Sequence, residues 1–379
     1  MKVLTVLGTR PEIIRLSPLI ELLDGLCEHV LVHTGQNSDP TLSDVFFEQL
    51  GVRTPDRYLG ITGGSFADRV GAIISRMGEV LPEERPDRLL VLGDTDSGLS
   101  AFVAKRLGIR VFHMEAGNRC FDDRVPEEVN RRLIDHASDV LMPYTERSRA
   151  NLLAEGIPSQ SIYVTGNPIK EVMDRHADAI DSSDALDRLG VERGGYLLLT
   201  AHRQETVDLE DRLSSLVVGV TGIAQDLGLP LVCSIHPRTK AKLESFGVEL
   251  EGEGVIVSPP LGFFDFLKLE RHARCVLTDS GTVQEECCIL GVPAVTVRDA
   301  TERPETVEGG SNLIAGVERE GIRRCVLTAL SSEPRWIPPR EYLVDAVSPT
   351  VARIVLGTAT GRNAVIPQTH QEVASGGRP

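Results

Sequence analysis

The 379-residue sequence contains few aromatic side chains, at 4%, and no apolar run long enough to span a membrane. Charged residues make up 25% and aliphatic residues are plentiful, which is typical of globular α/β proteins rather than disordered or fibrous ones. The first apolar segment, KVLTVL, meets Gly-Thr-Arg-Pro too soon and lacks the flanks of a signal peptide. We therefore expect a cytoplasmic protein with no membrane association.

A basic surface, paired cysteine motifs and the usual cofactor fingerprints are also missing. The formal net charge of −15 argues against a nucleic-acid partner, because a phosphate backbone requires a basic face. Seven scattered cysteines form no CxxC or Cys/His pattern, so we expect reduced thiols and no zinc site. No GxGxxG turn follows a strand, and GTRPE lacks the Lys-Ser/Thr of a P-loop. His113-Met-Glu115 has the HxE spacing of zinc deaminases but no PCxxC partner. The sequence thus predicts a site without metal or cofactor.

Length and periodicity together predict two α/β domains. A chain of 379 residues exceeds one ordinary core, and short apolar strands alternate with helical patterns from the first residue onward. The segment RPEIIRLSPLIELLDGL has helical spacing, and Pro126 suits the first turn of a later helix. This alternation predicts two Rossmann-like, doubly wound parallel sheets that face a cleft. We place an N-terminal domain at 1–168, a C-terminal domain at 169–364 and a flexible tail at 365–379.

Polar motifs recur at one position relative to the predicted strands. Nine of them directly follow a predicted strand: GTRPE, TGQN, GDTDS, HMEAGNR, TGNP, TAHR, SIHPR, TDSG and VRDATERPE. Open parallel sheets bind ligands at the carboxyl ends of their strands. Loops at one edge of both sheets would therefore bring these groups into a single cleft.

The motif TDSGTVQEE is typical of a phosphate site at the start of a helix. A helix N-terminus offers unpaired N–H groups and partial positive charge, and Gly281 lets a phosphate approach the backbone. The alternative interpretation is that Ser280 serves only as an N-cap. Glu285 and Glu286 follow on the same helix and either bind ribose hydroxyls or face solvent.

Cationic and imidazole side chains gather at other strand ends: Arg10, Arg15, His202, Arg203, His236, Arg238, Arg298 and Arg303. In so acidic a chain, this placement favours a diphosphate ligand. For any single member the alternative is an ion pair with a neighbouring carboxylate, and for Arg238 we prefer that alternative.

The charged stretch from His113 to Arg132 supplies acid/base candidates. Glu127 and Arg131 are four apart on the predicted helix, as are Glu128 and Arg132. We expect the first pair to face the cleft and the second to form an ion-pair ladder on the helix surface. An enclosed site shifts the pKa values of its titratable groups towards acid/base duty, and the candidates here are Asp94, Glu115, Glu127 and His202.

These motifs together resemble one known family. GTRPEIIRLSPL, GDT, HMEAGNR, PEEVNRR, TGNP, TAHR, TDSGTVQEE and RDATERPE are similar, in order, to motifs of the non-hydrolysing UDP-N-acetylglucosamine 2-epimerases. The resemblance runs from Val3 to about Gly310. It implies the glycosyltransferase-B architecture, a UDP-sugar substrate held mainly by the C-terminal domain, and usually a homodimer.

The resemblance also implies roles for individual residues. The positions of the family's catalytic acid/base groups are taken by Asp94, Glu115, Glu127 and His202. The positions that hold phosphate and ribose are taken by Arg10, His236, Ser280, Gly281, Glu286 and Arg303. Phe266 takes the place of an aromatic residue that stacks near uracil. Arg15 stands where many members have Lys, and Thr282 replaces the second Gly of DSGG. Both stay among the expected substrate-binding residues, together with Arg131.

The family reaction is elimination of UDP to a 2-acetamidoglycal, reprotonation on the other face and re-addition of UDP. The implied reaction is UDP-GlcNAc to UDP-ManNAc. The segment NRCFDDRVPEE instead resembles a subgroup that converts UDP-2-acetamido-2,6-dideoxy-L-talose to UDP-N-acetyl-L-fucosamine. A glycosyltransferase, a hydrolysing relative and a non-catalytic nucleotide-sugar sensor are the remaining alternatives. The sequence leaves open which carboxylate removes the C2 proton.

Overall fold

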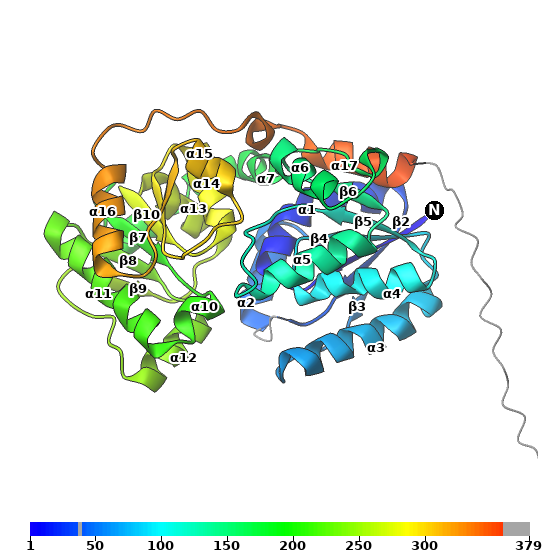
Figure 1. The fold of residues 1–379 in the computed structure, drawn as a ribbon, viewed down its shortest axis with the longest axis horizontal. Coiled ribbons are helices and arrows are strands. Elements are labelled where there is room, and N and C mark those ends of the chain that lie inside the picture. Colours follow the sequence, from blue (N-terminus) through cyan, green and yellow to red (C-terminus); the bar gives the residue numbers. More distant parts are fainter. Residues whose placement is uncertain (37–39, 359–379) are drawn as a thin grey trace, which may run out of the picture.

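The computed structural model describes residues 1–36 and 40–358, and the tail expected at 365–379 lies outside this range. Within it, the strands form two six-stranded parallel sheets (Figure 1). The first has the order β3-β2-β1-β4-β5-β6 and the second the order β12-β11-β10-β7-β8-β9, so that both wind outward from a central strand in the same way. Two doubly wound sheets in the predicted architecture are thereby confirmed.

The strands of the first sheet are β1 (Lys2–Leu7), β2 (Glu28–His33), β3 (Arg57–Tyr58), β4 (Arg88–Leu92), β5 (Arg110–Met114) and β6 (Val140–Met142). Those of the second are β7 (Leu197–Thr200), β8 (Leu231–Ser234), β9 (Val255–Ser258), β10 (Cys275–Thr278), β11 (Ala294–Thr296) and β12 (Asn312–Ile314). Central strands such as β4 and β10 are buried along their whole length, because helices cover both faces of each sheet. In the first sheet, Leu4 lies opposite Val30 on one side and Leu89 on the other.

The helices that precede β7 are α1 (Arg10–Leu26), α2 (Pro40–Gln49), α3 (Phe66–Glu84), η1 (Asp96–Leu99), α4 (Ser100–Arg106), α5 (Pro126–Ala137), α6 (Glu146–Ala154), η2 (Ser159–Ser161), α7 (Ile169–Arg175), α8 (Ala177–Asp181) and α9 (Ala185–Leu189). Those that follow it are α10 (Gln204–Val207), α11 (Glu210–Leu227), α12 (Pro237–Phe246), α13 (Phe263–His272), α14 (Gly281–Leu290), α15 (Pro304–Glu308), α16 (Arg319–Ala329), η3 (Arg340–Leu343) and α17 (Val347–Gly357). None of the described helices is long and apolar enough to cross a membrane.

The start of α1 shows how the sequence fixes the first loop. The Glu12 carboxylate accepts hydrogen bonds from the backbone N–H of Thr9 at 2.7 Å and of Gly8 at 2.9 Å, and from the Thr95 hydroxyl at 3.0 Å. Burial raises the pKa of Glu12 to about 7 in spite of these donors. The loop GTRPE is thereby tied to the loop after β4.

Some elements differ from the sequence expectation. The strands β3 and β12 were not predicted, because edge strands of two or three residues leave no periodic signal. The strand expected before TGNP is reduced to a single bridge between Leu141 and Ile162, since the chain there touches β6 at one point only. The helices expected at RPEIIRLSPLIELLDGL and from Pro126 onward are confirmed as α1 and α5.

The chain passes between the two sheets twice, and the two passages lie side by side. After β6 it leaves the first sheet for β7, and after η3 it returns as α17, which packs against α1. The Asn167 N–H donates to the Glu341 carbonyl at 2.9 Å, and the Ser348 N–H donates to the Glu171 carboxylate at 2.8 Å. Val351, fully buried on α17, belongs to the core of the first sheet. The domain limits predicted near 168 and 364 remain a prediction.

Truncation of Leu16 should test how strongly α1 holds this core. Leu16 is fully buried, and replacing it by Ala should lower the free energy of unfolding by about 2–5 kcal/mol because it leaves a cavity. Urea unfolding followed by circular dichroism measures the loss. Leu26→Ala, at the 61% exposed end of the same helix, is the control and should change stability by less than about 0.5 kcal/mol. Equal effects of the two changes would contradict the packing.

Candidate active site

The predicted polar residues come from the carboxyl ends of strands in both sheets. Asp94 lies two residues beyond β4, Glu115 directly follows β5, and His202 lies two residues beyond β7. In the second sheet, Ser280 lies two residues beyond β10. In Figure 1 the first sheet lies on the right and the second on the left, with α5 and α10 near the boundary. The strand ends of both halves thus supply side chains to this boundary.

Four of these side chains form a closed ring of alternating charge, which we call the charge ring. Arg15 pairs with Glu115 and Glu285, and Arg303 pairs with the same two carboxylates. All four side chains are buried, with at most 7% of any of them exposed. Arg15 and Glu115 belong to the first sheet's half of the molecule, whereas Glu285 and Arg303 belong to the second. The ring therefore joins the two halves and carries no net charge.

Glu115 is the member of the ring with the most unusual environment. Burial opposes its ionisation, but the charges of Arg15 and Arg303 outweigh burial and hold its pKa at about 2. The Tyr144 hydroxyl and the Asn118 amide each donate to its carboxylate at 3.3 Å. Its backbone has φ of 64°, a left-handed conformation that costs about 1–3 kcal/mol in residues other than glycine. Such strain at a strand end indicates a functional position.

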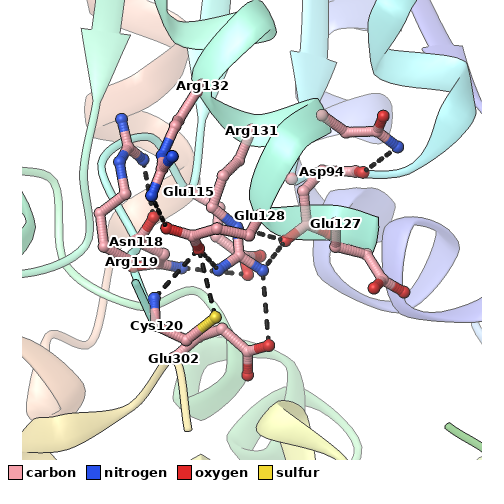
Figure 2. Close-up of polar contacts among 12 residues, drawn as sticks. Asp94, Glu115, Asn118, Arg119, Cys120, Glu127, Glu128, Arg131, Arg132 and Glu302 are labelled. Atoms are coloured by element: carbon pink, nitrogen blue, oxygen red, sulfur yellow. Dashed lines mark hydrogen bonds and ion pairs between the residues drawn. The ribbon is translucent and has the colours of Figure 1, made fainter. Parts of the chain in front are cut away.

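A second network surrounds Arg131 (Figure 2). Its guanidinium lies between three carboxylates: Asp94 at 2.6 Å, Glu128 at 2.7 Å and Glu302 at 3.5 Å. Burial raises the pKa of Asp94 in spite of the Arg131 charge. Burial also acts on Glu302, but there Arg298, Arg131 and other cations hold the pKa well below its usual range. Asp94 is the carboxylate of this network that most readily holds a proton.

The pairing expected on α5 is corrected. Arg131 pairs with Glu128, three residues earlier, and not with Glu127; the Glu127 carboxylate instead pairs with Arg203 of the other half at 2.7 Å. Glu128 does pair with Arg132 at 2.8 Å, but it is fully buried and is no part of a surface ladder. Its carboxylate also accepts from the N–H groups of residues 120 and 121, at 3.0 and 3.2 Å. The backbone N–H groups of this loop require a hydrogen-bond acceptor. The spacing of charges along the helix could not reveal that Glu128 supplies it.

Glu127 is an ionised carboxylate at the boundary between the two halves. Burial opposes its ionisation, but the Arg203 charge outweighs it and lowers the pKa of Glu127. Its side chain remains 27% exposed, more than the carboxylates of the charge ring. Glu127 is therefore the more accessible ionised carboxylate.

His202 and His236 lie together near Arg10. Their ring centroids are 5.9 Å apart, and burial lowers the pKa of both, that of His236 to about 4. Both imidazoles are therefore neutral near pH 7. The buried Asp279 carboxylate accepts from the His202 N–H at 2.7 Å and fixes this loop. Within the described residues no carboxylate pairs with Arg10, which leaves its cation for an anionic ligand.

The start of α14 has the features expected of a phosphate site. The Ser280 hydroxyl makes no capping hydrogen bond, so the interpretation as a mere N-cap finds no support in its contacts. A Cβ placed on Gly281 would lie 3.5 Å from the Arg303 guanidinium, which brings the helix N-terminus close to a cation. The Thr282 hydroxyl accepts from Arg15 at 3.2 Å.

The remaining candidates from the sequence are Arg238, Phe266 and Glu286. Arg238 pairs with Asp208, which confirms the expected ion pair. Phe266 lies partly buried on α13 against the core of the second sheet. Glu286 is only 3% exposed, so it does not face solvent. Among the described residues, no group of three or more His, Cys, Asp or Glu side chains is arranged to hold a metal ion. Glu302 was not singled out from the sequence, although it lies in the motif VRDATERPE.

Comparison with known proteins decides the family. Residues 24–355 match the family model described as UDP-N-acetylglucosamine 2-epimerase. The chain belongs to the UDP-N-acetylglucosamine 2-epimerase family. A UDP-N-acetylglucosamine 2-epimerase of Methanocaldococcus jannaschii is 40% identical over 347 residues, which cover 89% of this chain and 95% of the relative. A UDP-2,3-diacetamido-2,3-dideoxy-D-glucuronate 2-epimerase of Pseudomonas aeruginosa is 37% identical, with 87% and 92% covered.

Solved structures of the family have the same fold. The crystal structure of Methanocaldococcus jannaschii UDP-GlcNAc 2-epimerase in complex with UDP-GlcNAc and UDP matches with a TM-score of 0.89 and 38% identity, covering 93% of this chain and 99% of that one. The Neisseria meningitidis enzyme bound to UDP-GlcNAc matches with a TM-score of 0.85 and 28% identity, covering 94% and 100%. The resemblance of the motifs and the glycosyltransferase-B architecture are both confirmed.

Replacement of Glu285 should show what the charge ring contributes. Glu285→Gln leaves two buried arginines short of one negative charge, and we expect a loss of about 3–5 kcal/mol in unfolding free energy. Chemical denaturation measures it. Glu308→Gln is the matched control, because Glu308 also pairs across the two halves, with Arg147, but at the exposed surface, where such pairs contribute about 0–1 kcal/mol. A small effect at Glu285 would contradict the role of the ring.

Proposed function

We propose that this chain is a non-hydrolysing UDP-N-acetylglucosamine 2-epimerase, which interconverts UDP-GlcNAc and UDP-ManNAc. The observation that carries the proposal is the meeting of Asp94, Glu115 and Glu127 with arginines of both halves at one boundary. Family membership of the whole fold supports it.

The chemistry requires both kinds of group. The C2 proton of the sugar lies beside an acetamido nitrogen and is not acidified by a carbonyl, so its direct removal faces a high barrier. Elimination solves this: a carboxylate takes the C2 proton, the C–H electron pair forms the C1–C2 double bond, and UDP leaves with the electrons of the C1–O bond. A proton then adds to the opposite face of C2, and a UDP oxygen re-forms the bond to C1.

The departing diphosphate needs positive charge, and the site supplies it from several directions. We assign Arg10, Arg15 and Arg303 to the phosphates, with Ser280 and the Gly281 N–H at the start of α14. We assign Phe266 to uracil, Glu286 to the ribose and Arg131 to the orientation of Asp94 beside the sugar. Thr282 lies beside Arg15 and completes this wall.

The same arrangement links binding to acid/base chemistry. A diphosphate oxygen that enters the charge ring competes with Glu115 for Arg15 and Arg303. Because these two cations hold the pKa of Glu115 at about 2, their partial withdrawal raises its proton affinity when the substrate is bound. Asp94, whose pKa is raised by burial, serves as a proton donor, and Glu127, ionised beside Arg203, serves as an acceptor. The neutral His202 completes the acid/base set.

The alternative substrate is UDP-2-acetamido-2,6-dideoxy-L-talose. The loop that carries this alternative, NRCFDDRVPEE, is held by Glu128, which also pairs with Arg131, and this contact supports a role of the loop in shaping the sugar pocket. A cytoplasmic location and activity without NAD or a divalent ion remain part of the proposal.

Proton exchange at C2 is the central test. Incubation with UDP-GlcNAc in deuterium oxide, followed by proton NMR, should yield UDP-ManNAc that carries deuterium at C2. Glu127→Gln removes one proton-transfer group and should slow the reaction by roughly 100-fold or more, while UDP binding measured by calorimetry is retained.

Glu146→Gln, an exposed carboxylate at the start of α6, serves as the control and should turn over normally. Epimerised product without deuterium would exclude the elimination route. Normal turnover of the Glu127 variant would remove this residue from the mechanism. Free sugar and UDP as end products would indicate a hydrolysing enzyme instead, and turnover of the deoxytalose sugar alone would favour the alternative substrate.

We further infer that the chain forms a homodimer through α4 and α5, which pack against each other. Phe102 on α4 is 54% exposed, and Val129 and Leu133 on α5 are 46% and 58% exposed. The latter two are four residues apart and share one helix face. A second copy related by a two-fold axis would cover these apolar side chains.

An arginine at position 133 should disrupt this dimer, because it places an unpaired charge in an apolar contact. Light scattering coupled to size exclusion should report a dimer for the wild type and a shift towards monomer for Leu133→Arg. Leu209→Arg, at a 54% exposed position outside this face, is the control and should leave the dimer intact. A monomeric wild type would refute the inference.

A further inference from the structure

Glu270 is a buried carboxyl that the proposed mechanism does not use. It lies on α13, one helical turn after Phe266, and its side chain is fully buried. Within the described residues, neither of its carboxylate oxygens receives a hydrogen bond from a donor group. A buried carboxylate without donors is costly, so another group must compensate for it.

The neighbour of Glu270 is a second carboxyl, Glu286 of α14. The two side chains lie within hydrogen-bonding contact of each other, and Glu286 is only 3% exposed. Burial, reinforced by the adjacent carboxyl, raises the pKa of Glu270, and burial raises that of Glu286 to about 8. Two buried carboxyls in contact cannot both ionise, so the pair retains at least one proton near pH 7.

The groups around the pair define which member is the donor. Glu286 faces Arg15 and Glu285 of the charge ring, so its side chain borders the candidate active site. Glu270 faces Tyr196, whose hydroxyl donates to a backbone carbonyl, and Cys287, whose pKa burial raises well above its usual range. Arg15 lies on the Glu286 side, so Glu286 is the member that ionises first, and the remaining proton stays on Glu270.

The placement of the pair relates it to the nucleoside. Phe266 and Glu270 are four residues apart on α13 and share one helix face. Ser280 is the N-cap residue of α14, and Glu286 lies within this helix. The helix α14 packs against α13. With uracil at Phe266 and the phosphates at Ser280, as assigned above, the ribose comes to lie next to Glu286.

We propose that Glu270 is a positioning residue for the nucleoside: as a carboxylic acid it donates a hydrogen bond to Glu286 and holds that carboxylate to accept both hydroxyls of the ribose diol. The inference rests on the proposed function, because it takes UDP as the ligand. Each of the two ribose hydroxyls donates a hydrogen bond, and a carboxylate held in a fixed position offers one oxygen to each of them. Loss of the shared proton sets two carboxylates against each other and displaces the acceptor.

The experiment compares UDP with 2′,3′-dideoxy-UDP in calorimetric titrations at pH 7. At pH 7, Glu270→Leu removes the donor and should weaken UDP binding about tenfold, but it should leave binding of the dideoxy nucleotide within about twofold. Glu270→Gln keeps a donor at every pH and should bind UDP like the wild type at pH 7.

Glu244→Gln, an exposed carboxylate on α12, is the control and should behave as the wild type throughout. Equal losses for both nucleotides in the Leu variant would show a purely structural role and overturn the proposal. Epimerisation is measured separately. Diol-dependent UDP binding without epimerisation would refute the proposed function but not this role of Glu270. Epimerisation combined with UDP binding that does not depend on Glu270 would refute this role but not the proposed function.

Discussion

The charge ring of Arg15, Glu115, Glu285 and Arg303 is the interaction on which the arrangement of the site depends. Each half supplies one arginine and one glutamate that pair with each other, and two further pairs, Arg15–Glu285 and Arg303–Glu115, cross between the halves. The distances within it fix where the end of β5 lies relative to α14. Asp94, Glu127 and the histidines then acquire their positions relative to one another because their own strands and helices are rigidly attached to the same two sheets.

A buried ring of this kind is not explained by stability. Removing charges from water costs several kcal/mol per ion, and well-packed apolar residues would often serve a stable interface equally well. What the ring supplies is geometry, since each planar guanidinium donates in fixed directions and uses one nitrogen for Glu115 and another for Glu285. It also keeps the arginines in the places where phosphate oxygens are expected, with carboxylates as temporary substitutes.

Much of the architecture could be predicted from the sequence, because strand and helix periods are local properties. The start of α5 at Pro126 and the whole span of α1 follow from side-chain spacing and from proline's fixed backbone angle. The partners of charged side chains were harder to predict. Glu128 and Arg132 have surface spacing on a helix, yet a loop folds over Glu128 and buries it. The Glu270–Glu286 pair joins two helices whose contact no sequence period records.

The paired passage of the chain between the sheets limits how the two halves can move relative to each other. Gly166 has φ of 88° and lies so close to Val344 that a Cβ there would meet its side chain at 2.8 Å. The hydrogen bond from the Asn167 N–H to the Glu341 carbonyl joins the two passages at the same point. Two connections fastened side by side act as a flexure: they bend about one axis and resist torsion. Any relative movement of the two halves is thereby restricted to bending about this axis, which keeps the arginines of one half opposite the same carboxylates of the other.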